Sequence, residues 1–280
     1  MRTDTRILGR VRDIEAWQEA FVVGAARHWP EYLMEAAELA AFMIVAALSA
    51  AALDHPASPV HRAIANPLLR RLIGGVLMGL TAIALVRSPW GRRSGAHMNP
   101  SLTLTFLRLG KIAPADALAY MAAQFTGAAV GIAVAALVIG PAIGSPEVNY
   151  VATRPGPAGV LAAFGGELAI SFVLMAVVLV LTNDLRVARL TPYAVGVLVA
   201  AYITIEAPLS GMSMNPARSF GPALVARIWD SLWVYFVAPP LGMLLAAEAY
   251  VGWRGAHAVQ CAKLHHHNTA RCIFRCAYQS

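Results

Sequence analysis

The sequence predicts an all-α membrane protein, with six transmembrane helices and two re-entrant half-helices arranged as an inverted repeat. Hydrophobic residues make up 58% of the 280 residues, and Asp, Glu, Lys and Arg together make up only 13%, about half of the roughly 25% that is typical of soluble domains. Six apolar stretches are long enough to cross a bilayer, and two Asn-Pro segments stand at matching places in the two halves of the chain. This composition excludes a disordered chain, a fibrous protein and a typical soluble enzyme.

Each expected span is rich in Ala, Leu, Val and Ile and approaches the roughly 20 residues that cross the hydrocarbon core as a helix. Such stretches are too long for strands and too apolar for exposed helices. The spans are expected at approximately residues 33–53, 70–87, 114–139, 160–182, 191–207 and 232–252.

The spans define a membrane domain over residues 33–252, in which one repeat covers about 33–140 and the other about 160–252. A cytoplasmic N-terminal segment, residues 1–32, precedes this domain. Apolar positions recur in that segment every three or four residues, which predicts an amphipathic helix lying on the membrane surface. A tail, residues 253–280, follows the domain and combines basic residues with Cys and His.

The charge pattern predicts the orientation of the chain. The net charge of +7 comes from 22 Lys and Arg residues against 15 Asp and Glu residues. With both termini in the cytoplasm, 16 of the 22 basic residues lie inside and six lie outside. Positive charge accumulates in the cytoplasmic loops of membrane proteins, so this topology explains the basic balance without a nucleic-acid partner. We therefore expect a multi-pass protein of the cell inner membrane.

The two segments that follow the second span of each half do not resemble plain loops. Residues 94–109 read SGAHMNPSLTLTFLRL, and residues 210–225 read SGMSMNPARSFGPALV. Each has an Asn-Pro pair before an apolar run of roughly 8–10 residues, which is too short to span the bilayer. Pro suits the first turn of a helix and Asn suits its N-cap. Each segment is therefore predicted to enter the membrane as a half-helix.

The two halves are predicted to be inverted with respect to each other. Each begins with a span that carries a glutamate, ELAAFMIVAAL from Glu38 and ELAISFVLMAV from Glu167. Because three spans per half is an odd number, the two half-helices enter from opposite faces and can meet near the midplane. We expect Glu38 and Glu167 to accept hydrogen bonds from the unwound backbone of the Asn-Pro segments, and a proton relay is the alternative role.

The chemistry of the Asn-Pro segments favours the passage of neutral molecules. A half-helix N-terminus carries unpaired N–H groups and about half a positive charge, so two facing ends repel cations, including hydronium. Asn99 and Asn215 add amide donors that do not titrate. A water oxygen held by both would turn its hydrogens away in both directions, which interrupts a proton-conducting wire. Arg218, permanently cationic in a nearly uncharged segment, is the candidate for a polar constriction on the outer side.

The segments GAHMNPSLTL and GMSMNPARSFGPAL resemble the two signatures of the aquaporin, or major intrinsic protein, family. The resemblance covers roughly residues 33–252, as in a bacterial member with an extended N-terminus and a Cys/His-containing tail. It implies six spans, two half-helices, a pore in each subunit and usually a homotetramer. It assigns the pore motifs to Asn99, Pro100, Ser101, Asn215, Pro216 and Ala217, and structural support to Glu38, Glu167, His97 and Gln124. For His97 we expect a hydrogen bond within its loop, with a pH gate as the alternative.

The resemblance also locates the family's selectivity constriction, at Met78, Ile203, Met212 and Arg218. Strict water channels usually carry His where Ile203 stands and an aromatic residue where Met78 stands. An apolar wall with one donor group suits small amphipathic solutes. Ser101 replaces the usual Ala of the first motif, and this one hydroxyl should leave the half-helix intact.

The expected function is a passive transmembrane channel that conducts water and other small uncharged solutes and excludes protons and ions. The apolar constriction favours amphipathic solutes, whereas Ser219 after Arg218 and the aromatic pair Tyr235-Phe236 are similar to the water-conducting branch. A glycerol or small-solute facilitator is therefore the alternative. An ion-coupled secondary transporter is a second alternative, which would need ionisable residues at the midplane. The apolar body shows no cluster typical of an enzyme, and we expect none.

The tail is a candidate metal site. Four of its residues form a C-x3-H-x6-C-x3-C spacing: Cys261, His265, Cys272 and Cys276. Thiolates and imidazole suit Zn²⁺, although this is not a standard finger spacing, and His266 and His267 are alternative ligands. The other reading is a protein without cofactors, whose basic tail is attracted to anionic lipid and keeps its Cys reduced.

Overall fold

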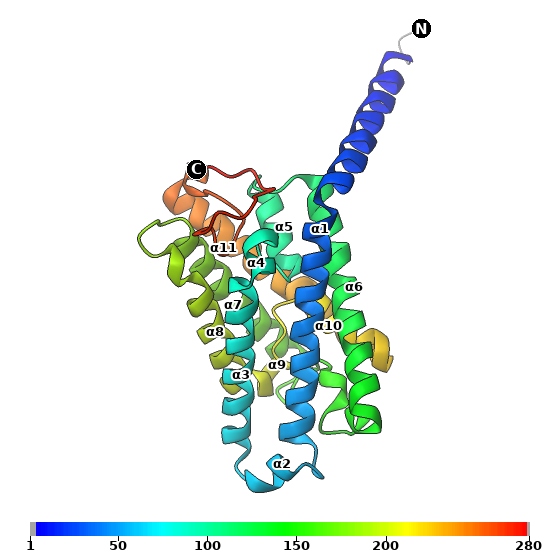
Figure 1. Cartoon of the computed structure of the whole chain (residues 1–280), viewed down its shortest axis with the longest axis vertical. Coiled ribbons are helices and arrows are strands. Elements are labelled where there is room, and N and C mark those ends of the chain that lie inside the picture. The colour runs from blue at the N-terminus through cyan, green and yellow to red at the C-terminus, as the bar shows by residue number, and fades with distance from the viewer. Residues whose placement is uncertain (1–3, 279–280) are drawn as a thin grey trace.

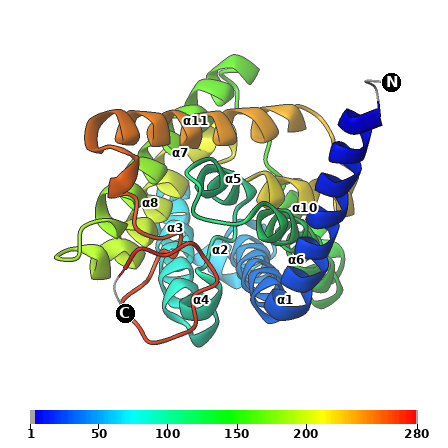
Figure 2. The ribbon, with the colours of Figure 1, turned by 90° about the horizontal axis from the view of Figure 1, so that it is seen from above.

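A computed structural model describes the backbone of residues 4–278 and the side chains of residues 26–278. In that part of the chain six helices are long and apolar enough to cross a membrane, which confirms the expected number of spans. They pack side by side as one bundle (Figures 1 and 2). The helices are α1 (Asp4–Asp54), α3 (Pro67–Arg87), α6 (Pro114–Ile139), α7 (Val160–Thr182), α8 (Thr191–Ile205) and α11 (Leu232–Arg254).

Short helices lie in the connections, and proline sets where several of them begin. Pro67 opens α3 directly after the N-cap Asn66, whose Oδ1 accepts the N–H groups of Leu68 and Leu69 at 2.9 and 3.2 Å. Proline suits this first position because its missing N–H is one that no helix bonds. The connecting helices are α2 (Pro59–Ala63), α4 (Pro89–Ser94), α9 (Ala207–Ser210) and the 3₁₀ turns η1 (Gly140–Gly144), η2 (Asn149–Val151), η3 (Ala188–Leu190) and η4 (Ala256–Ala258).

The N-terminal segment differs from the expected separate surface helix. It continues into the first span as one helix, α1, with Pro30 in its interior. Ala and Glu, which favour helix, are frequent on both sides of Pro30, and this composition explains the continuity. The first part of α1, dark blue in Figure 1, extends beyond the bundle. Its side chains before residue 26 lie outside the described part, so an apolar face on it remains a prediction.

Two half-helices lie inside the bundle, as expected. They are α5 (Pro100–Arg108), with nine residues, and α10 (Pro216–Ala226), with 11 residues. Asn99 and Asn215 are their N-caps. Asn99 Oδ1 accepts the N–H of Ser101 at 2.9 Å, and Asn215 Oδ1 accepts that of Ala217 at 3.0 Å. The two Asn-Pro pairs therefore start the two half-helices in the same way.

Small residues let the spans approach closely enough to enclose the half-helices. Where α3 crosses α8, a Cβ added at Gly75 would lie 2.6 Å from the carbonyl oxygen of Ala200. A Cβ added at Gly79 would overlap the carbonyl oxygen of Gly196. Lipid tails are as apolar as the side chains that face them, so close packing of backbones contributes much of the association between helices in a membrane.

Glu167 of α7 holds the second Asn-Pro segment. Its Oε1 accepts the hydroxyl of Ser210 and the N–H of Ser213, both at 2.7 Å. Its Oε2 accepts the N–H of Met214 at 2.7 Å. Non-helical backbone within a membrane protein needs such internal partners. Glu167 therefore occupies the structural position that was predicted for it.

In the first half the corresponding partner is Glu35, whereas Glu38 was expected. Glu35 Oε1 accepts the N–H of His97 at 2.8 Å, and its Oε2 accepts the N–H of Met98 at 2.7 Å. Glu38 instead accepts the hydroxyl of Ser94, at 3.1 Å from Oε2. The two glutamates are three residues apart and share one helix face, so the sequence pattern could not separate them.

The packing of the spans supports the same correspondence between residues of the two halves. Gly127 of α6 lies against Ala36, the residue after Glu35. Gly242 of α11 lies against Leu168, the residue after Glu167. In the structure Glu35 therefore corresponds to Glu167. The sequence alignment of ELAAF, from Glu38, with ELAIS, from Glu167, differs from this correspondence by one helical turn.

The C-terminal tail folds back onto the bundle, which differs from the alternative of a tail lying along lipid. Lys263 is only 2% exposed, and its Nζ donates to the carbonyl oxygens of Arg92, Ala270 and Arg271 at 2.8, 3.1 and 2.7 Å. The N–H of Leu264 donates to the carbonyl oxygen of Gly95 at 3.1 Å. All three ammonium hydrogens are therefore used inside the protein.

A first prediction tests the close approach of α3 and α8. Gly79→Ala should lower the thermal stability of the purified protein, because overpacking against backbone costs about 1–3 kcal/mol. Gly165→Ala is the matched control, since a Cβ at Gly165 of α7 would meet no atom within 4 Å. Thermal unfolding of both variants in the same detergent measures the effect. Equal melting temperatures for the two variants would contradict the packing described here.

A second prediction separates the two glutamates of α1. Glu35→Gln should destabilise the protein by about 1–3 kcal/mol, because the new amide group faces N–H donors and leaves one of them unsatisfied. Glu38→Gln keeps a side-chain oxygen for the Ser94 hydroxyl and should cost less. The same melting measurement compares them. A larger loss of thermal stability in the Glu38 variant would instead support Glu38 as the counterpart of Glu167, as first expected from the sequence.

Candidate functional site

An internal cavity lies between the spans, and both Asn-Pro segments line it. Its volume is about 130 Å³, which leaves room for several water molecules. Most of its wall is apolar and comes from α1, α3, α7 and α8, through Leu39, Phe42, Ala82, Leu174, Val195 and Val199. The polar groups are few, and those of the half-helices are Asn99, Asn215 and Arg218.

The two Asn-Pro segments bind each other across the cavity. Asn99 Nδ2 donates to the carbonyl oxygen of Met214 at 2.7 Å. Asn215 Nδ2 donates to the carbonyl oxygen of Met98, also at 2.7 Å. Each asparagine therefore caps its own half-helix through its oxygen and fastens the opposite segment through its nitrogen.

This arrangement gives the cavity directed hydrogen-bond donors. A side-chain amide carries two N–H hydrogens, and each asparagine uses one on the opposite carbonyl. The second hydrogen of each remains for a molecule in the cavity that both side chains line. The positive ends of the α5 and α10 dipoles lie at the same place, because Asn99 and Asn215 are the N-caps. The centre of the cavity thus offers donors and partial positive charge.

The four residues expected at a constriction come together in the structure. A second, wider cavity of about 580 Å³ opens beside the first. Both cavities are lined by Met78 of α3, Ile203 of α8, Met212 and Arg218. Residues shared by two neighbouring cavities stand at their junction, so these side chains form the passage between the inner cavity and the wider one.

The guanidinium of Arg218 is held at this junction. Its Nη1 donates to the carbonyl oxygen of Val151 at 2.8 Å. Residues Asn149, Tyr150 and Val151 all have positive φ, at 43°, 53° and 52°, a conformation that a β-branched residue such as Val rarely adopts. The unusual turn at η2 therefore supplies the acceptor that orients Arg218. Arg218 lines both cavities, so its guanidinium borders the passage.

The expected support residues lie around the first Asn-Pro segment. His97 Nδ1 lies 2.9 Å from Thr103 Oγ1, and its Nε2 lies 2.9 Å from the carbonyl oxygen of Ala262. Gln124 Nε2 donates to Glu35 Oε2 at 2.8 Å. Ser101 is fully buried, and its hydroxyl has no partner among the described residues. One ring nitrogen of His97 thus makes the expected local contact, with Thr103, and the other contacts the C-terminal tail at Ala262.

Leu264 of the tail also lines the cavity, a contact that was not expected from the sequence. It lies with Val86 and Ala96 at the end of the cavity away from the constriction, because Met78 and Val86 are two turns apart on α3. This separation of eight residues corresponds to about 12 Å along a helix. No local signal in the tail indicates this contact, since it depends on how a long-range segment folds back. For Glu35, the sequence did offer a signal of its supporting role, because it lies one helical turn before Glu38 on the same face.

The tail residues also come together, with one difference from the expected set. The thiols of Cys261, Cys272 and Cys276 gather around the imidazole of His266, whereas His265 was expected. Neighbouring residues of a non-helical segment point in different directions, so His265 turns away when His266 faces the thiols.

Comparisons with known proteins agree with this geometry. The family described as major intrinsic protein matches residues 25–250. The chain is 35% identical over 176 residues to the "Probable aquaporin NIP7-1" of Arabidopsis thaliana, covering 62% of each protein. It is 36% identical over 189 residues to the "Aquaporin TIP4-4" of Zea mays, covering 64% of this chain and 73% of that protein. The first of these matches thus spans about three-fifths of the length of the relative.

A solved structure shares the fold. The X-ray structure of the aquaglyceroporin from Plasmodium falciparum superposes with a TM-score of 0.65 at 19% sequence identity, covering 80% of this chain and 95% of that one. This likeness concerns the arrangement of the helices. Because the family match covers most of the chain, and because two Asn-capped half-helices meet inside six spans, the chain belongs to the aquaporin, or major intrinsic protein, family.

Proposed function

We propose that the protein is a passive membrane channel that conducts water and other small uncharged solutes and excludes protons and ions. The observation that carries the proposal is the reciprocal pair of hydrogen bonds from Asn99 to Met214 and from Asn215 to Met98. It brings two helix N-termini and two neutral amide donors to one cavity. A water oxygen can accept from both amides, and a cation meets positive dipole ends from both sides.

The constriction supports a channel for water and small amphipathic solutes. Met78, Ile203 and Met212 give it apolar sides, and Arg218 gives it one fixed cation with several donors. Such a site favours a molecule with hydroxyl or carbonyl oxygens on one side and carbon on the other. Water passes with the Arg218 donors as partners, and glycerol is the first solute to test. Methionine side chains are flexible, so the opening adapts to its occupant.

The two buried carboxylates that contact the Asn-Pro segments favour a channel over an ion-coupled transporter. A driving cation would need free carboxylate oxygens near the cavity. Glu35 and Glu167 are occupied by backbone N–H groups of the Asn-Pro segments. Neither lines the cavity. We therefore assign both to the scaffold.

The proposal includes a setting for the channel. It lies in the cell inner membrane with both termini in the cytoplasm, which is supported by the 16-to-6 distribution of basic residues. The partner is a further copy of the chain in a homotetramer. Large apolar side chains on the outer faces of the spans, such as Leu137 and Leu161 at 85% and 84% exposed, offer surface to lipid and to neighbouring subunits. No enzymatic activity is part of this proposal.

Permeability measurements on proteoliposomes test the function. Stopped-flow light scattering in an impermeant osmolyte should show faster shrinkage than in protein-free vesicles, and glycerol should cause re-swelling. A pH-sensitive dye inside the vesicles should report no added proton flux. Solute accumulation that depends on an ion gradient would instead favour the transporter.

The constriction has its own test in Ile203→His. A second polar side chain there should slow glycerol about tenfold, which corresponds to roughly 1.4 kcal/mol of discrimination, while water flow persists. Ile205→His is the matched control, because Ile205 is 78% exposed on the outside of the same helix. Unchanged glycerol and water flow in the Ile203 variant would remove this residue from the selectivity site.

A further inference from the structure

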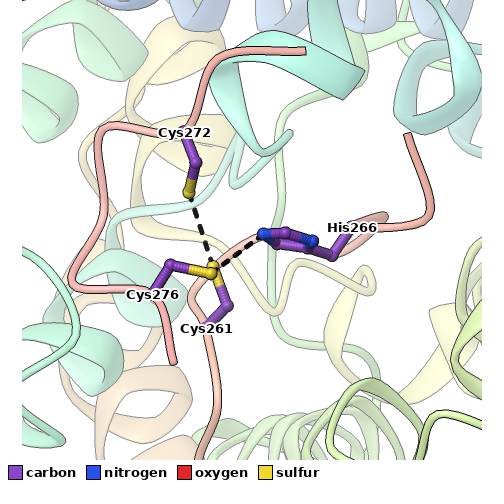
Figure 3. Close-up of side chains that lie close together, drawn as sticks. All are labelled: Cys261, His266, Cys272 and Cys276. Atoms are coloured by element: carbon purple, nitrogen blue, oxygen red, sulfur yellow. Dashed lines mark hydrogen bonds between the residues drawn. The ribbon is translucent and has the colours of Figure 1, made fainter. Parts of the chain in front are cut away.

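Four side chains of the C-terminal tail form a compact cluster of metal-ligand atoms. The sulfur atoms of Cys261, Cys272 and Cys276 and a ring nitrogen of His266 all lie within 4.8 Å of one another (Figure 3). The Cys261 and Cys272 sulfur atoms are 3.6 Å apart. Cys276 Sγ lies 3.0 Å from His266 Nε2. Figure 3 shows the four side chains converging from separate stretches of the tail.

The dimensions of the cluster fit a tetrahedral zinc ion. Zn–S bonds of about 2.3 Å and Zn–N bonds of about 2.0 Å put tetrahedral ligand atoms about 3.5–3.8 Å apart. The observed separations bracket this spacing. A disulfide would need sulfur atoms about 2.05 Å apart, and all three cysteines are free. Three thiolates and one imidazole form a closed set of the structural type, without an open position for a substrate.

The surroundings of the cluster orient the ligands and admit an ion. The ring of His266 stacks on Tyr278, with centroids 4.5 Å apart, which fixes the plane of the imidazole. An open cavity of about 830 Å³ borders His266, Cys272 and Cys276, so an ion can reach the thiols from solvent. A zinc ion with three thiolates carries one net negative charge. The buried ammonium of Lys263, on the same tail, has the opposite charge.

The tail has an irregular backbone that a cross-link of this kind would stabilise. From Val259 to Tyr278 it contains no helix and no strand. Its backbone is tied to the bundle by isolated bonds, such as that from the N–H of Leu264 to Gly95 and that from the N–H of Arg275 to Lys111. Val259, Leu264 and Phe274 are buried against the bundle. A structural metal would add a cross-link among the remaining irregular stretches.

The same tail covers the inner end of the cavity. Leu264 lines it, and the neighbouring carbonyl of Ala262 lies 2.9 Å from His97 Nε2. Phe274 stacks on the ring of His97, with the two ring centroids 5.2 Å apart. Leu264, which lines the cavity, and Ala262 and Phe274, which contact His97, lie between residues of the cluster along the chain. Ordering the cluster therefore orders this cover.

We propose that Cys261, His266, Cys272 and Cys276 bind one zinc ion, and that the zinc-bound tail holds Leu264 over the inner end of the lumen, so that zinc lowers water permeability. The second part rests on the proposed function, and the first part does not. By linkage, an ion that binds only the folded tail stabilises the covered state of the lumen.

Metal analysis of the full chain tests the site. The protein, purified through a tag without histidine, should retain about one zinc per chain after incubation with zinc chloride and desalting. His266→Ala should lower zinc affinity at least tenfold, and His267→Ala, an exposed neighbour outside the cluster, should not. Because a ligand variant can fail to fold, the wild-type chain is also stripped with a chelator and reloaded. Wild-type protein that takes up no zinc, or that forms a Cys261–Cys272 disulfide instead, would overturn the site.

Water permeability of proteoliposomes tests the cover, with zinc or chelator present on both sides of the membrane. Stripping the wild-type protein should raise permeability at least twofold, and reloading should reverse the rise. Leu264→Ala should raise permeability even with zinc bound. Equal permeability of zinc-loaded and stripped protein would overturn the cover and leave the site standing. Permeability no higher than that of protein-free vesicles, in every state, would instead contradict the proposed function.

Discussion

The fold depends on satisfying the backbone of two non-helical segments deep within a membrane protein. Hydrocarbon offers no partners for free N–H and C=O groups, so such segments persist only with internal ones. Glu35 and Glu167 accept the N–H groups just before each half-helix. Asn99 and Asn215 then satisfy one carbonyl of the opposite segment. The hydrogen bonds that stabilise the two segments therefore also orient the amide donors of the cavity. The supporting residues and the pore residues belong to one hydrogen-bond network.

Close packing of the spans makes that network possible. Glycine at the crossings of α3 with α8, α1 with α6 and α7 with α11 brings the backbones together, and each larger side chain would meet a carbonyl. The crossings leave a central space that two short helices fill from opposite ends. The same spans form the wall around the asparagines, and this wall is apolar because the spans are apolar along their length. A lumen with few polar groups is thus a consequence of how the bundle is assembled.

Much of this could be predicted from the sequence, since membrane helices are specified by local composition. The six spans, the half-helices and their Asn caps depend on apolar length and on Asn-Pro pairs, which are local signals. Placing Met78, Ile203, Met212 and Arg218 together required the family resemblance as well. Glu35 was missed because Glu38 lies on the same helix face, one turn away. The choice of His266 over His265, and the contact of Leu264, could not be predicted because they depend on the path of an irregular tail, which only long-range contacts determine.

The cover over the inner end of the lumen belongs to the same chain as the lumen itself. A short stretch of chain connects Leu264 to Arg254, the last residue of α11. The effective concentration of Leu264 at the inner end of the cavity is therefore set by the length of this connection and not by the amount of protein in the membrane. The response of such a cover to zinc would therefore be the same at low and at high density of the protein in the membrane. In an oligomer, each subunit would also open and close on its own, and partial responses would add up as a graded conductance.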